Sequence, residues 1–318
     1  ERRFPMGWLR LTASKRSVGK KLPFNGNNLT VEETTPEAFR DADIVFISVS
    51  SSISRELAPL AVNAGAVVID DSSAFRMNSD VPLVVPEINS EDLSHHKGIT
   101  SNPNCSTIQM VMALYPIHQV NPVKRVIVDT YQSVSGTGAA AVQEMHDQFA
   151  KNLKGREIQA QIYPHQIAFN VLPHIEPFLE NGYTQEELKM LQETQKILHA
   201  PEIQVSATCV RVPVEIGHSE ALHIELSHPI SVQEVRKILS NFPGVTVVDD
   251  PAHDIYPLPI KAAGHDDVFV GRIRQDSSNP NGIAMWIVSD NLRKGAATNS
   301  VQIAEELVKR NLFLRQRA

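Results

Sequence analysis

Short apolar runs and a helical pattern alternate in the first third of the chain. Residues 43–49 and 66–70 are nearly continuous apolar runs, which is typical of strands buried on both faces of a parallel sheet. Between them, residues 54–64 place apolar side chains at helical spacing, and Gly65 can end this helix in the left-handed conformation. A strand, a helix and a strand in this order predict a βαβ unit with a right-handed crossover.

Two weaker signals flank this unit. Residues 8–12 alternate between apolar and polar side chains and predict a short strand. Residues 98–101 predict another strand, and the turn at residues 102–104 leads directly into a helix over residues 105–118. The first third of the chain is therefore expected to form a parallel sheet with helices packed on it.

The pattern changes after residue 118. Long strands alternate with helices and longer loops, which indicates a mixed sheet, the usual partner of a parallel α/β domain. Residues 291–310 predict a long terminal helix, and the absence of repeats and of a low-complexity linker predicts two closely packed domains. The strands expected in the second part are residues 124–133, 203–214, 221–226, 268–274 and 283–289.

Composition narrows the class of protein. The chain has 318 residues, 42% of them hydrophobic, and a formal net charge of −6, which gives no electrostatic reason to expect nucleic acid or an anionic membrane as a partner. Cys105 and Cys209 are the only cysteines, too few for a disulfide framework, and they favour a reducing compartment. No apolar run approaches the ~20 residues of a membrane span, and no signal peptide is recognisable. We expect a soluble, cytoplasmic protein.

One cysteine lies where a nucleophile could be activated. Cys105 falls in the first turn of a helix that follows a strand, within Ser-Asn-Pro-Asn-Cys-Ser-Thr at residues 101–107. Unpaired backbone N–H groups and the positive end of the helix dipole stabilise a thiolate in such a place. The same N–H groups could hold an oxyanion or a phosphate oxygen. The alternative is a small buried cysteine beside a loop, but the polar neighbours favour a nucleophile.

A thiolate nucleophile usually needs an acid or base partner. His218 follows a predicted strand and a short turn, and Arg211 lies on that strand, where its guanidinium could bind a substrate carboxylate through two hydrogen bonds. Alone this is a weak signal, because a histidine at a turn is more often a surface residue. No His-Glu-x-x-His or paired-cysteine spacing indicates zinc. The histidines interpreted as surface residues are His95, His96, His199, His228 and His265.

The chain resembles the aspartate-semialdehyde dehydrogenase family in several ordered motifs. The resemblance runs from about residue 4 to the C-terminus, and the order of so many motifs is far more specific than any one of them. The matching segments are residues 101–107 around Cys105, Thr-Tyr-Gln-Ser-Val-Ser-Gly-Thr-Gly at 130–138, Glu-Thr-Gln-Lys at 193–196, Cys-Val-Arg-Val-Pro-Val at 209–214, Gly-His-Ser-Glu-Ala at 217–221 and Ser-Asp-Asn-Leu-Arg-Lys-Gly-Ala-Ala at 289–297.

The resemblance implies an enzyme that interconverts aspartate-β-semialdehyde, phosphate and NADP⁺ with β-aspartyl phosphate and NADPH, a step towards lysine, methionine and threonine. It implies that Cys105 attacks the carbonyl carbon to form a hemithioacetal or, from the acyl phosphate, a thioester. His218 would move the proton, and Gln132 would position the substrate and stabilise the tetrahedral species. The implied substrate-binding residues are Arg211 for the α-carboxylate, Glu193 for the α-ammonium group, and Lys196, Arg76 and Asn104 for phosphate.

Each of these roles has a plainer alternative. Glu193 and Lys196 are three residues apart on an expected helix and could form an ordinary surface ion pair. Arg76 could be a solvated loop residue, and Gln132 could satisfy backbone groups at the end of a strand. Only the set of motifs as a whole favours the functional interpretation.

The cofactor is expected to be NADP. Ser14, Arg16 and Ser17 follow the first predicted strand, at the position where a dinucleotide-binding fold contacts the adenosine ribose. An arginine with hydroxyl groups favours a 2′-phosphate, and the acidic residue typical of NAD binding is absent from this loop. The residues that contact the nicotinamide end by resemblance are Ser133, Gly136 and Asn291.

The resemblance implies an α/β protein with a Rossmann-type NADP-binding domain over residues 1–104 with 291–318. An α+β mixed-sheet catalytic and dimerisation domain would span residues 105–290, within a homodimer or homotetramer. The family opens with an apolar strand and a glycine-rich turn that this sequence lacks, so we expect a truncated nucleotide-binding domain. Residues 50–52 are serines where a glycine-rich stretch is expected, and serine lets a ligand approach the backbone less closely.

Other functions stay open at this point. N-acetyl-γ-glutamyl-phosphate reductase would use the same chemistry on a longer substrate, and glyceraldehyde-3-phosphate dehydrogenase is a more distant rival. The segments around Cys105 and Glu193 favour the aspartyl enzyme over both. A cysteine hydrolase would use Cys105 and His218 without a nucleotide. A truncated, non-catalytic dimer partner would keep a reactive Cys105 and show no turnover.

Overall fold

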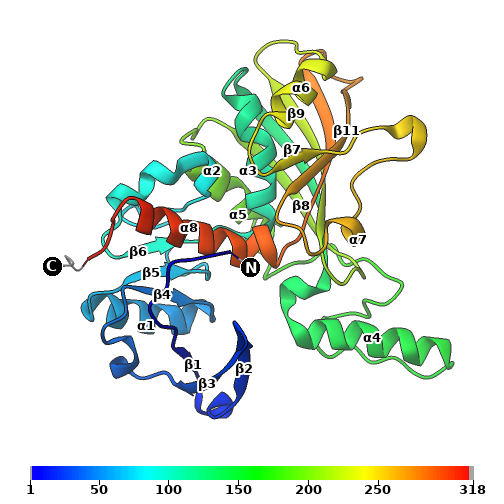
Figure 1. The fold of residues 1–318 in the computed structure, drawn as a ribbon. Coiled ribbons are helices and arrows are strands. Elements are labelled where there is room, and N and C mark those ends of the chain that lie inside the picture. Colours follow the sequence, from blue (N-terminus) through cyan, green and yellow to red (C-terminus); the bar gives the residue numbers. More distant parts are fainter. Residues whose placement is uncertain (1, 315–318) are drawn as a thin grey trace. The chain divides into compact units, whose positions relative to one another are not determined.

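The computed structural model describes residues 2–314 (Figure 1). The chain divides into two compact units. The first contains the residues up to 82, residues 91–102 and those from 300 onward, and the second contains residues 83–90 and 103–299. The first unit holds a parallel, Rossmann-like sheet, and the second holds a large mixed sheet, as the predicted α/β class requires.

The compact units differ from the sequence-based domains in three segments. Residues 83–90, 103–104 and 291–299 belong to the second unit. Hydrogen bonds join the first and the last of these segments: Lys294 Nζ donates to Glu87 Oε2 at 2.6 Å, and Asn299 Nδ2 donates to the Val84 carbonyl oxygen at 2.9 Å. The division of function between residues 1–104 with 291–318 and residues 105–290 stays a prediction.

The first unit confirms the predicted strand, helix and parallel strand. β4 (Ile44–Ile47) is followed by α1 (Ser51–Asn63) and by β5 (Val67–Asp70), which runs parallel to β4. β5 is completely buried, whereas the Phe46 side chain in β4 is 44% exposed. The expectation that residues 43–49 are buried on both faces is therefore wrong. The reason is that β5 is the only strand paired with β4 in residues 2–314, so one edge of β4 lies open.

β6 (Ile99–Ser101) pairs in parallel with β5 and completes this sheet. The first unit also holds a second sheet of three strands. β1 (Leu11–Ala13) pairs in parallel with β3 (Asn27–Glu33), and β3 pairs antiparallel with β2 (Lys21–Phe24). The sequence analysis missed this hairpin. Its turn is Asn25–Gly26, a strong hairpin signal, because both residues tolerate the positive φ angles of +46° and +77° observed there.

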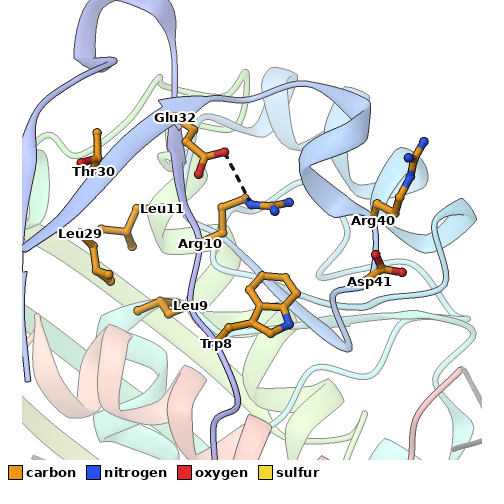
Figure 2. A pocket seen from close by; sticks show the side chains of 9 residues that line it. All are labelled: Trp8, Leu9, Arg10, Leu11, Leu29, Thr30, Glu32, Arg40 and Asp41. Carbon is orange, nitrogen blue, oxygen red and sulfur yellow. Dashed lines mark ion pairs between the residues drawn. The ribbon is translucent and has the colours of Figure 1, made fainter.

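Two hollows open on the first unit. The larger, of about 990 Å³, is lined mainly by apolar residues of the N-terminal segment and of β4, and Ser17 also lies on it. Figure 2 shows the smaller, of about 500 Å³. Trp8, Arg10 and Glu32 line its wall, and an Arg10 nitrogen lies 3.6 Å from a Glu32 carboxylate oxygen. The smaller hollow is lined by none of the predicted site residues.

A six-stranded mixed sheet forms the centre of the second unit. Its strand order is β10-β11-β12-β9-β7-β8; β7 and β8 are parallel, and β9 is antiparallel to both β7 and β12. The five long strands expected in this part are all present: β7 (Val123–Gln132), β8 (Gln204–Arg211), β9 (His218–Leu226), β11 (Val268–Gln275) and β12 (Gly282–Ser289). The sixth strand, β10 (Val245–Val247), is short and was not predicted.

Helices of the second unit pack on this sheet and share its core. Ile108 of α3 and Met190 of α5 belong to the same apolar cluster as Leu222 of β9. α3 is buried on nearly every side, which is typical of a helix in the middle of a domain. The helices of this unit are α2 (Pro86–Asn89), α3 (Cys105–His118), α4 (Ala139–Leu153), α5 (Gln185–Ile197), α6 (Val232–Ser240) and α7 (Pro259–Ala262).

The long terminal helix expected over residues 291–310 is interrupted. A π-helical turn, η6 (Arg293–Ala297), precedes α8 (Thr298–Lys309). The Asp290 carboxylate accepts two backbone N–H groups of the following turn, at 2.8 and 3.1 Å, so helical structure begins only there. The wide turn also places the Lys294 side chain in the interior, where it is 1% exposed. Within residues 2–314, no helix is long and apolar enough to cross a membrane.

Candidate active site

Cys105 is the first residue of α3, as predicted, and its side chain is partly exposed. Asn104 caps the helix: its Oδ1 atom accepts hydrogen bonds from the backbone N–H groups of Ser106 (3.0 Å) and Thr107 (3.2 Å). The expectation that such N–H groups hold an oxyanion or phosphate is wrong for these two, because the cap residue already occupies them. The thiol still lies at the positive end of the helix dipole, where a thiolate is favoured.

Backbone rather than a side chain covers one side of Cys105. A Cβ atom at Gly295 would lie 3.1 Å from the Cys105 Cβ atom, which is tighter than most such contacts. Gly295 belongs to η6, and Lys294 anchors this turn through Glu87 and Asn299, the latter at 2.9 Å from its Nζ. The π-helical turn therefore fixes how close the chain comes to Cys105.

A buried carboxylate lies beside the start of α3. Glu186, in the first turn of α5, is 4% exposed and accepts hydrogen bonds at Oε1 from Asn104 Nδ2 (2.9 Å) and Gln132 Nε2 (3.1 Å). Its Oε2 atom lies 3.4 Å from Lys189 Nζ. Burial is the largest influence on the Glu186 pKa and raises it, but Lys189, the two amides and Arg211 together outweigh burial and lower the pKa. Glu186 is therefore a buried negative charge.

The local sequence explains why α5 begins where it does. Thr184 and Glu187 form a capping box, in which each side chain accepts the other residue's backbone N–H group. The other carboxylate oxygen of Glu187 accepts the backbone N–H group of Cys209, in β8, at 2.9 Å. Since this one side chain holds both the helix start and the strand, Glu186 is placed at a fixed position relative to β8.

Glu193 lies on the same side of α5, two turns after Glu186. It is 1% exposed, and its Oε2 atom accepts the backbone N–H group of Asn104 at 2.7 Å. Glu193 is therefore not a surface residue as the plainer alternative expected, and Lys196 is half-buried. Glu193 supports the turn before Cys105, and it is Glu186 whose carboxylate meets the Gln132 side chain.

Arg211 ends β8 and pairs with Gln132, the last residue of β7. It is 5% exposed, and its Nη1 atom donates to the Ser133 carbonyl oxygen at 2.7 Å. Its Nε atom has no hydrogen-bond partner among the described residues. Arg211 is close enough to Glu186 to help lower the pKa of that carboxylate. The site thus holds one buried positive and one buried negative group near Gln132.

His218 is the first residue of β9, where it pairs with Ser289 of β12. It follows a turn, as the sequence analysis expected, but it already belongs to the strand, which was predicted to begin at residue 221. Pairing with β12 extends the strand by three residues and buries the ring completely. His218 is therefore a residue of the sheet rather than of a mobile or exposed turn.

Hydrogen bonding defines the state of the His218 ring. Its Nδ1 atom accepts the backbone N–H group of Ser133 at 3.1 Å, whereas Nε2 has no partner among residues 2–314. Burial, and after it the charge of Arg211, lower the pKa of His218 well below its usual value. The ring is therefore neutral near pH 7, and because Nδ1 accepts a hydrogen bond, the ring proton resides on Nε2.

Asn291 joins the loops around His218. Its Oδ1 atom accepts hydrogen bonds from Ser133 Oγ (3.0 Å), Ser135 Oγ (3.3 Å) and the Gly217 backbone N–H group (2.9 Å). Its Nδ2 atom donates to Ser135 Oγ at 3.0 Å. Both ends of the amide are engaged, so Asn291 holds this part of the site together.

Gly136 lies on the loop after β7, close to two of the charged or polar groups of the site. A Cβ atom there would lie 3.2 Å from both Arg211 Nη1 and His218 Nε2. A larger residue at position 136 would crowd the Arg211 guanidinium and the His218 ring, so the glycine keeps the space beside these two groups open.

Arg76 lies in the first unit and is 7% exposed, so it is not the solvated loop residue of the plainer alternative. Its Nε atom donates to the Asn102 carbonyl oxygen and its Nη2 atom to the Asp71 carbonyl oxygen, each at 2.9 Å. Asn102 follows β6 and Asp71 follows β5, so the guanidinium is held at the carboxyl ends of two parallel strands, where α/β folds bind ligands.

Ser14, Arg16 and Ser17 follow β1, around a 3₁₀ turn (Lys15–Ser17). Ser14 and Arg16 are exposed, and Ser17 lines the larger hollow. A basic, hydroxyl-rich turn after a parallel strand and next to a hollow fits the adenosine end of a dinucleotide.

Hydrogen bonds bring most of the predicted residues of the second unit together in two sets. The first set contains Asn104, Gln132 and Glu193, with Glu186 between Asn104 and Gln132. The second set contains Ser133, Arg211, His218 and Asn291. The sequence analysis missed Glu186 and Lys189. The Thr-x-x-Glu capping box at residues 184–187, which includes Glu186, was the available signal, since it marks the first turn of α5. No group of three or more His, Cys, Asp or Glu side chains in the described residues could hold a metal ion.

Two family models match the chain. Residues 1–96 match the NAD binding domain of semialdehyde dehydrogenase, and residues 114–294 match its dimerisation domain. The second match supports an oligomeric protein.

Comparison with known proteins gives the same family. Aspartate-semialdehyde dehydrogenase of Aquifex aeolicus is 55% identical over 317 residues, which cover 98% of this chain and 93% of the relative. The crystal structure of aspartate semialdehyde dehydrogenase II from Vibrio cholerae has a TM-score of 0.92 at 46% identity, over 96% of this chain and 91% of that one. The enzyme of Candida albicans, crystallised with NADP, has a TM-score of 0.75 at 27% identity, over 95% and 91%. The chain belongs to the aspartate-semialdehyde dehydrogenase family.

Proposed function

We propose that this protein catalyses the reductive dephosphorylation of β-aspartyl phosphate to aspartate-β-semialdehyde, and the reverse phosphorylating oxidation, through a thioester on Cys105. The observation that carries the proposal is the surroundings of one helix terminus. A partly exposed thiol begins α3, and the buried Glu186, Arg211 and His218 lie in the same unit. An amino acid with a reactive carbonyl has four groups to bind, and each has a suitable partner there. Cys105 suits the carbonyl carbon, His218 the carbonyl oxygen, Arg211 the carboxylate and Glu186 the ammonium group.

The Cys105 thiolate attacks the acyl carbon in the reductive direction, the carbon–oxygen bond to phosphate breaks, and phosphate leaves with the electron pair. NADPH supplies, when bound, the hydride that reduces the resulting thioester. The alkoxide formed at that carbon accepts a hydrogen bond from His218 Nε2–H, which has no other partner in the described residues. When this alkoxide collapses, the carbon–sulfur bond to Cys105 breaks, the aldehyde is released and the thiolate forms again. Atoms and charges therefore balance without a proton leaving His218.

Arg211 and Glu186 recognise the two ends of the amino acid. Arg211, whose Nε atom has no hydrogen-bond partner within residues 2–314, binds the α-carboxylate, and Gln132 orients the reacting carbonyl. Glu186, rather than Glu193, binds the α-ammonium group, because Glu193 is engaged with the Asn104 backbone. An N-acetylated substrate has no positive charge to offer a buried carboxylate, which disfavours the glutamyl-phosphate reductase alternative.

Basic residues are proposed to bind phosphate and cofactor. In the second unit, Lys189 joins Lys196 and Asn104 as proposed phosphate-binding residues, since its ammonium group is next to Glu186. In the first unit, Arg76 is proposed for phosphate because its guanidinium lies at the carboxyl ends of β5 and β6. For NADP, Ser14, Arg16 and Ser17 bind the adenosine 2′-phosphate end. Ser133, Gly136 and Asn291 shape the nicotinamide end, with Asn291 acting through the loops that it joins.

The proposed enzyme is a homodimer or homotetramer of the cytoplasm. Ile127 and Tyr131 are 38% and 39% exposed on β7, within the segment that matches the dimerisation domain, and a nucleophilic thiol must stay reduced. Light scattering that finds only monomers at micromolar concentration would contradict the assembly.

Phosphate-dependent NADPH formation from aspartate-β-semialdehyde tests the function. We expect NADPH formation with this aldehyde that needs inorganic phosphate, and none with N-acetylglutamate semialdehyde. A folded protein with no activity on the aspartyl substrate in either direction would sink the proposal. Ester or amide hydrolysis that ignores NADPH would favour a cysteine hydrolase instead.

Glu186→Gln is expected to raise KM for aspartate-β-semialdehyde by about 10- to 100-fold, because it removes the charge that pairs with the α-ammonium group. Glu193→Gln is the matched control on the same helix face: its amide oxygen can still accept the Asn104 N–H group, so KM should change by less than about three-fold. Steady-state kinetics of both variants give the comparison. The reverse order of effects would assign the ammonium group to Glu193.

A further inference from the structure

Lys294 is a buried lysine that the proposed mechanism does not use. It lies in the π-helical turn η6, and its side chain is 2% exposed. Its Nζ atom donates to Glu87 Oε2 at 2.6 Å and to Asn299 Oδ1 at 2.9 Å. An ammonium group is stable in the interior only when it is paired, and separating such a pair is strongly unfavourable. The ion pair therefore ties η6 firmly to the segment that carries Glu87.

The segment that carries Glu87 is itself held in place. Glu87 belongs to the short helix α2, and Leu83 and Val85 just before it are part of the apolar core of the second unit. The Asn89 side chain closes the segment on itself. Its Oδ1 atom accepts the Val85 backbone N–H group, and its Nδ2 atom donates to the Leu83 carbonyl oxygen, each at 2.9 Å. Glu87 is therefore a fixed point for the turn.

The wide turn brings Gly295 against the first residue of α3. The Gly295 backbone N–H group donates to the Asp290 carbonyl oxygen at 3.2 Å, five residues earlier, which is the spacing of a π-helix. A Cβ atom at Gly295 would lie 3.1 Å from the Cys105 Cβ atom and 3.5 Å from its Cα atom. The φ angle of Gly295 is not positive, so this close approach, rather than the backbone conformation, requires a glycine. No water molecule fits between the two.

We propose that Lys294 and Glu87 are positioning residues that hold η6 against Cys105 and so keep water from one side of the acyl thioester, an inference that rests on the proposed dehydrogenase function. In the oxidative direction, phosphate has to attack this thioester. If water adds to the acyl carbon instead, the carbon–sulfur bond breaks, aspartate and the thiol form, and no acyl phosphate is made. Excluding water prevents this loss of a reactive intermediate.

NADPH formation with and without phosphate measures the loss directly, because hydrolysis frees Cys105 for another turnover in the absence of phosphate. Lys294→Met keeps the length of the side chain and removes the ammonium group. The ratio of NADPH formed without phosphate to NADPH formed with saturating phosphate is expected to rise by at least about 10-fold. Arg293→Met is the matched control in the same turn, since its side chain is 27% exposed and pairs with Asp266. Its ratio should stay within about two-fold of the wild type.

Alkylation of Cys105 by iodoacetamide gives a second readout that needs no substrate. It is measured at a pH at which the thiol is fully ionised, so that the rate reports access to the sulfur rather than its pKa. Lys294→Met should be alkylated about five- to ten-fold faster, because η6 is no longer held in place, and Arg293→Met should match the wild type. Gly295→Ala places a methyl group against Cys105 and should be alkylated at least about five-fold more slowly.

Opposite changes in Lys294→Met and Gly295→Ala support the proposal, since a general loosening of the fold would speed alkylation in both. Faster alkylation in both variants would overturn it. So would a folded Lys294→Met protein with the phosphate dependence and alkylation rate of the wild type. If Lys294→Met does not fold, Glu87→Gln takes its place. That variant keeps an oxygen for the Lys294 Nζ atom and removes only the charge, so both readouts should change in the same direction by at least about three-fold.

The two readouts also separate this inference from the proposed function. A wild-type protein that forms no NADPH would contradict the proposed function, while alkylation would still test how η6 covers Cys105. An active wild-type protein, together with variants of Lys294 and Glu87 that are alkylated at the wild-type rate, would contradict this inference alone.

Discussion

Replacement of Cys105 by serine is expected to lower kcat/KM for aspartate-β-semialdehyde by about 10⁴-fold or more. A serine hydroxyl is not ionised at neutral pH, and the terminus of α3 cannot change this enough to make it a comparable nucleophile. The groups proposed to bind substrate, Glu186 and Arg211, are left in place. Mass spectrometry after mixing with β-aspartyl phosphate should show an acyl group on the wild-type chain and none on the variant.

Cys209→Ala is the matched control. Cys209 is completely buried, and burial, with a smaller effect of the Glu186 charge, raises the pKa of its thiol far above the usual value, so it is not a nucleophile near pH 7. Activity should stay within about three-fold of the wild type, since only the packing of a small side chain changes. Equal losses in the two cysteine variants would refute the assignment of the nucleophile.

Replacement of His218 by asparagine is expected to lower kcat by about 10²- to 10⁴-fold, with a much smaller effect on KM. The asparagine Oδ1 can still accept the Ser133 N–H group in place of Nδ1, so the loop should keep its place. What disappears is the Nε2–H donor that faces the reacting oxygen. Single-turnover measurements in the reductive direction should place the loss in the reduction of the thioester rather than in its formation.

His218→Gln distinguishes a hydrogen-bond donor from a proton carrier. Its amide NH₂ group can reach the place of Nε2 and donate, so it should recover at least about ten-fold of the activity lost in His218→Asn. His223→Asn, on the exposed side of the same strand, where the ring pairs with Asp276 at 3.1 Å, should leave turnover unchanged. Equal losses in His218→Gln and His218→Asn would favour proton transfer over hydrogen bonding.

The sequence predicted the helix start at Cys105 because several local signals agree there. The preceding strand, the turn after it and the apolar pattern of α3 all place Cys105 at a helix start, and the structure has the helix begin at that residue. The strands of the second unit were predictable for the same reason, since their apolar runs are long. The apolar run of β4 did not by itself predict the open edge of this strand, because an apolar run does not show how many strands pair with it.

The choice between two glutamates could not be made from the sequence. Glu186 and Lys189 repeat as Glu193 and Lys196 seven residues later, which is two helical turns, so both glutamates lie on one face of α5. Periodicity alone treats them as equivalent. Only contacts between distant segments separate them: one carboxylate meets the side chain at the end of β7, and the other meets a backbone amide before α3.

The two hydrogen bonds of Glu187 fix the distance between the two groups that are proposed to bind the substrate. One of its oxygens holds the start of α5 and the other holds β8, so the carboxylate of Glu186 and the guanidinium of Arg211 belong to a single rigid frame. If this frame binds both the ammonium and the carboxylate group of an amino acid, it fixes the distance from the α-carbon of that amino acid to the Cys105 sulfur. An aldehyde one methylene longer would place its carbonyl carbon beyond the Cys105 thiolate. Selectivity for chain length would then depend on the hydrogen bond between Glu187 and the Cys209 backbone, which contacts no substrate.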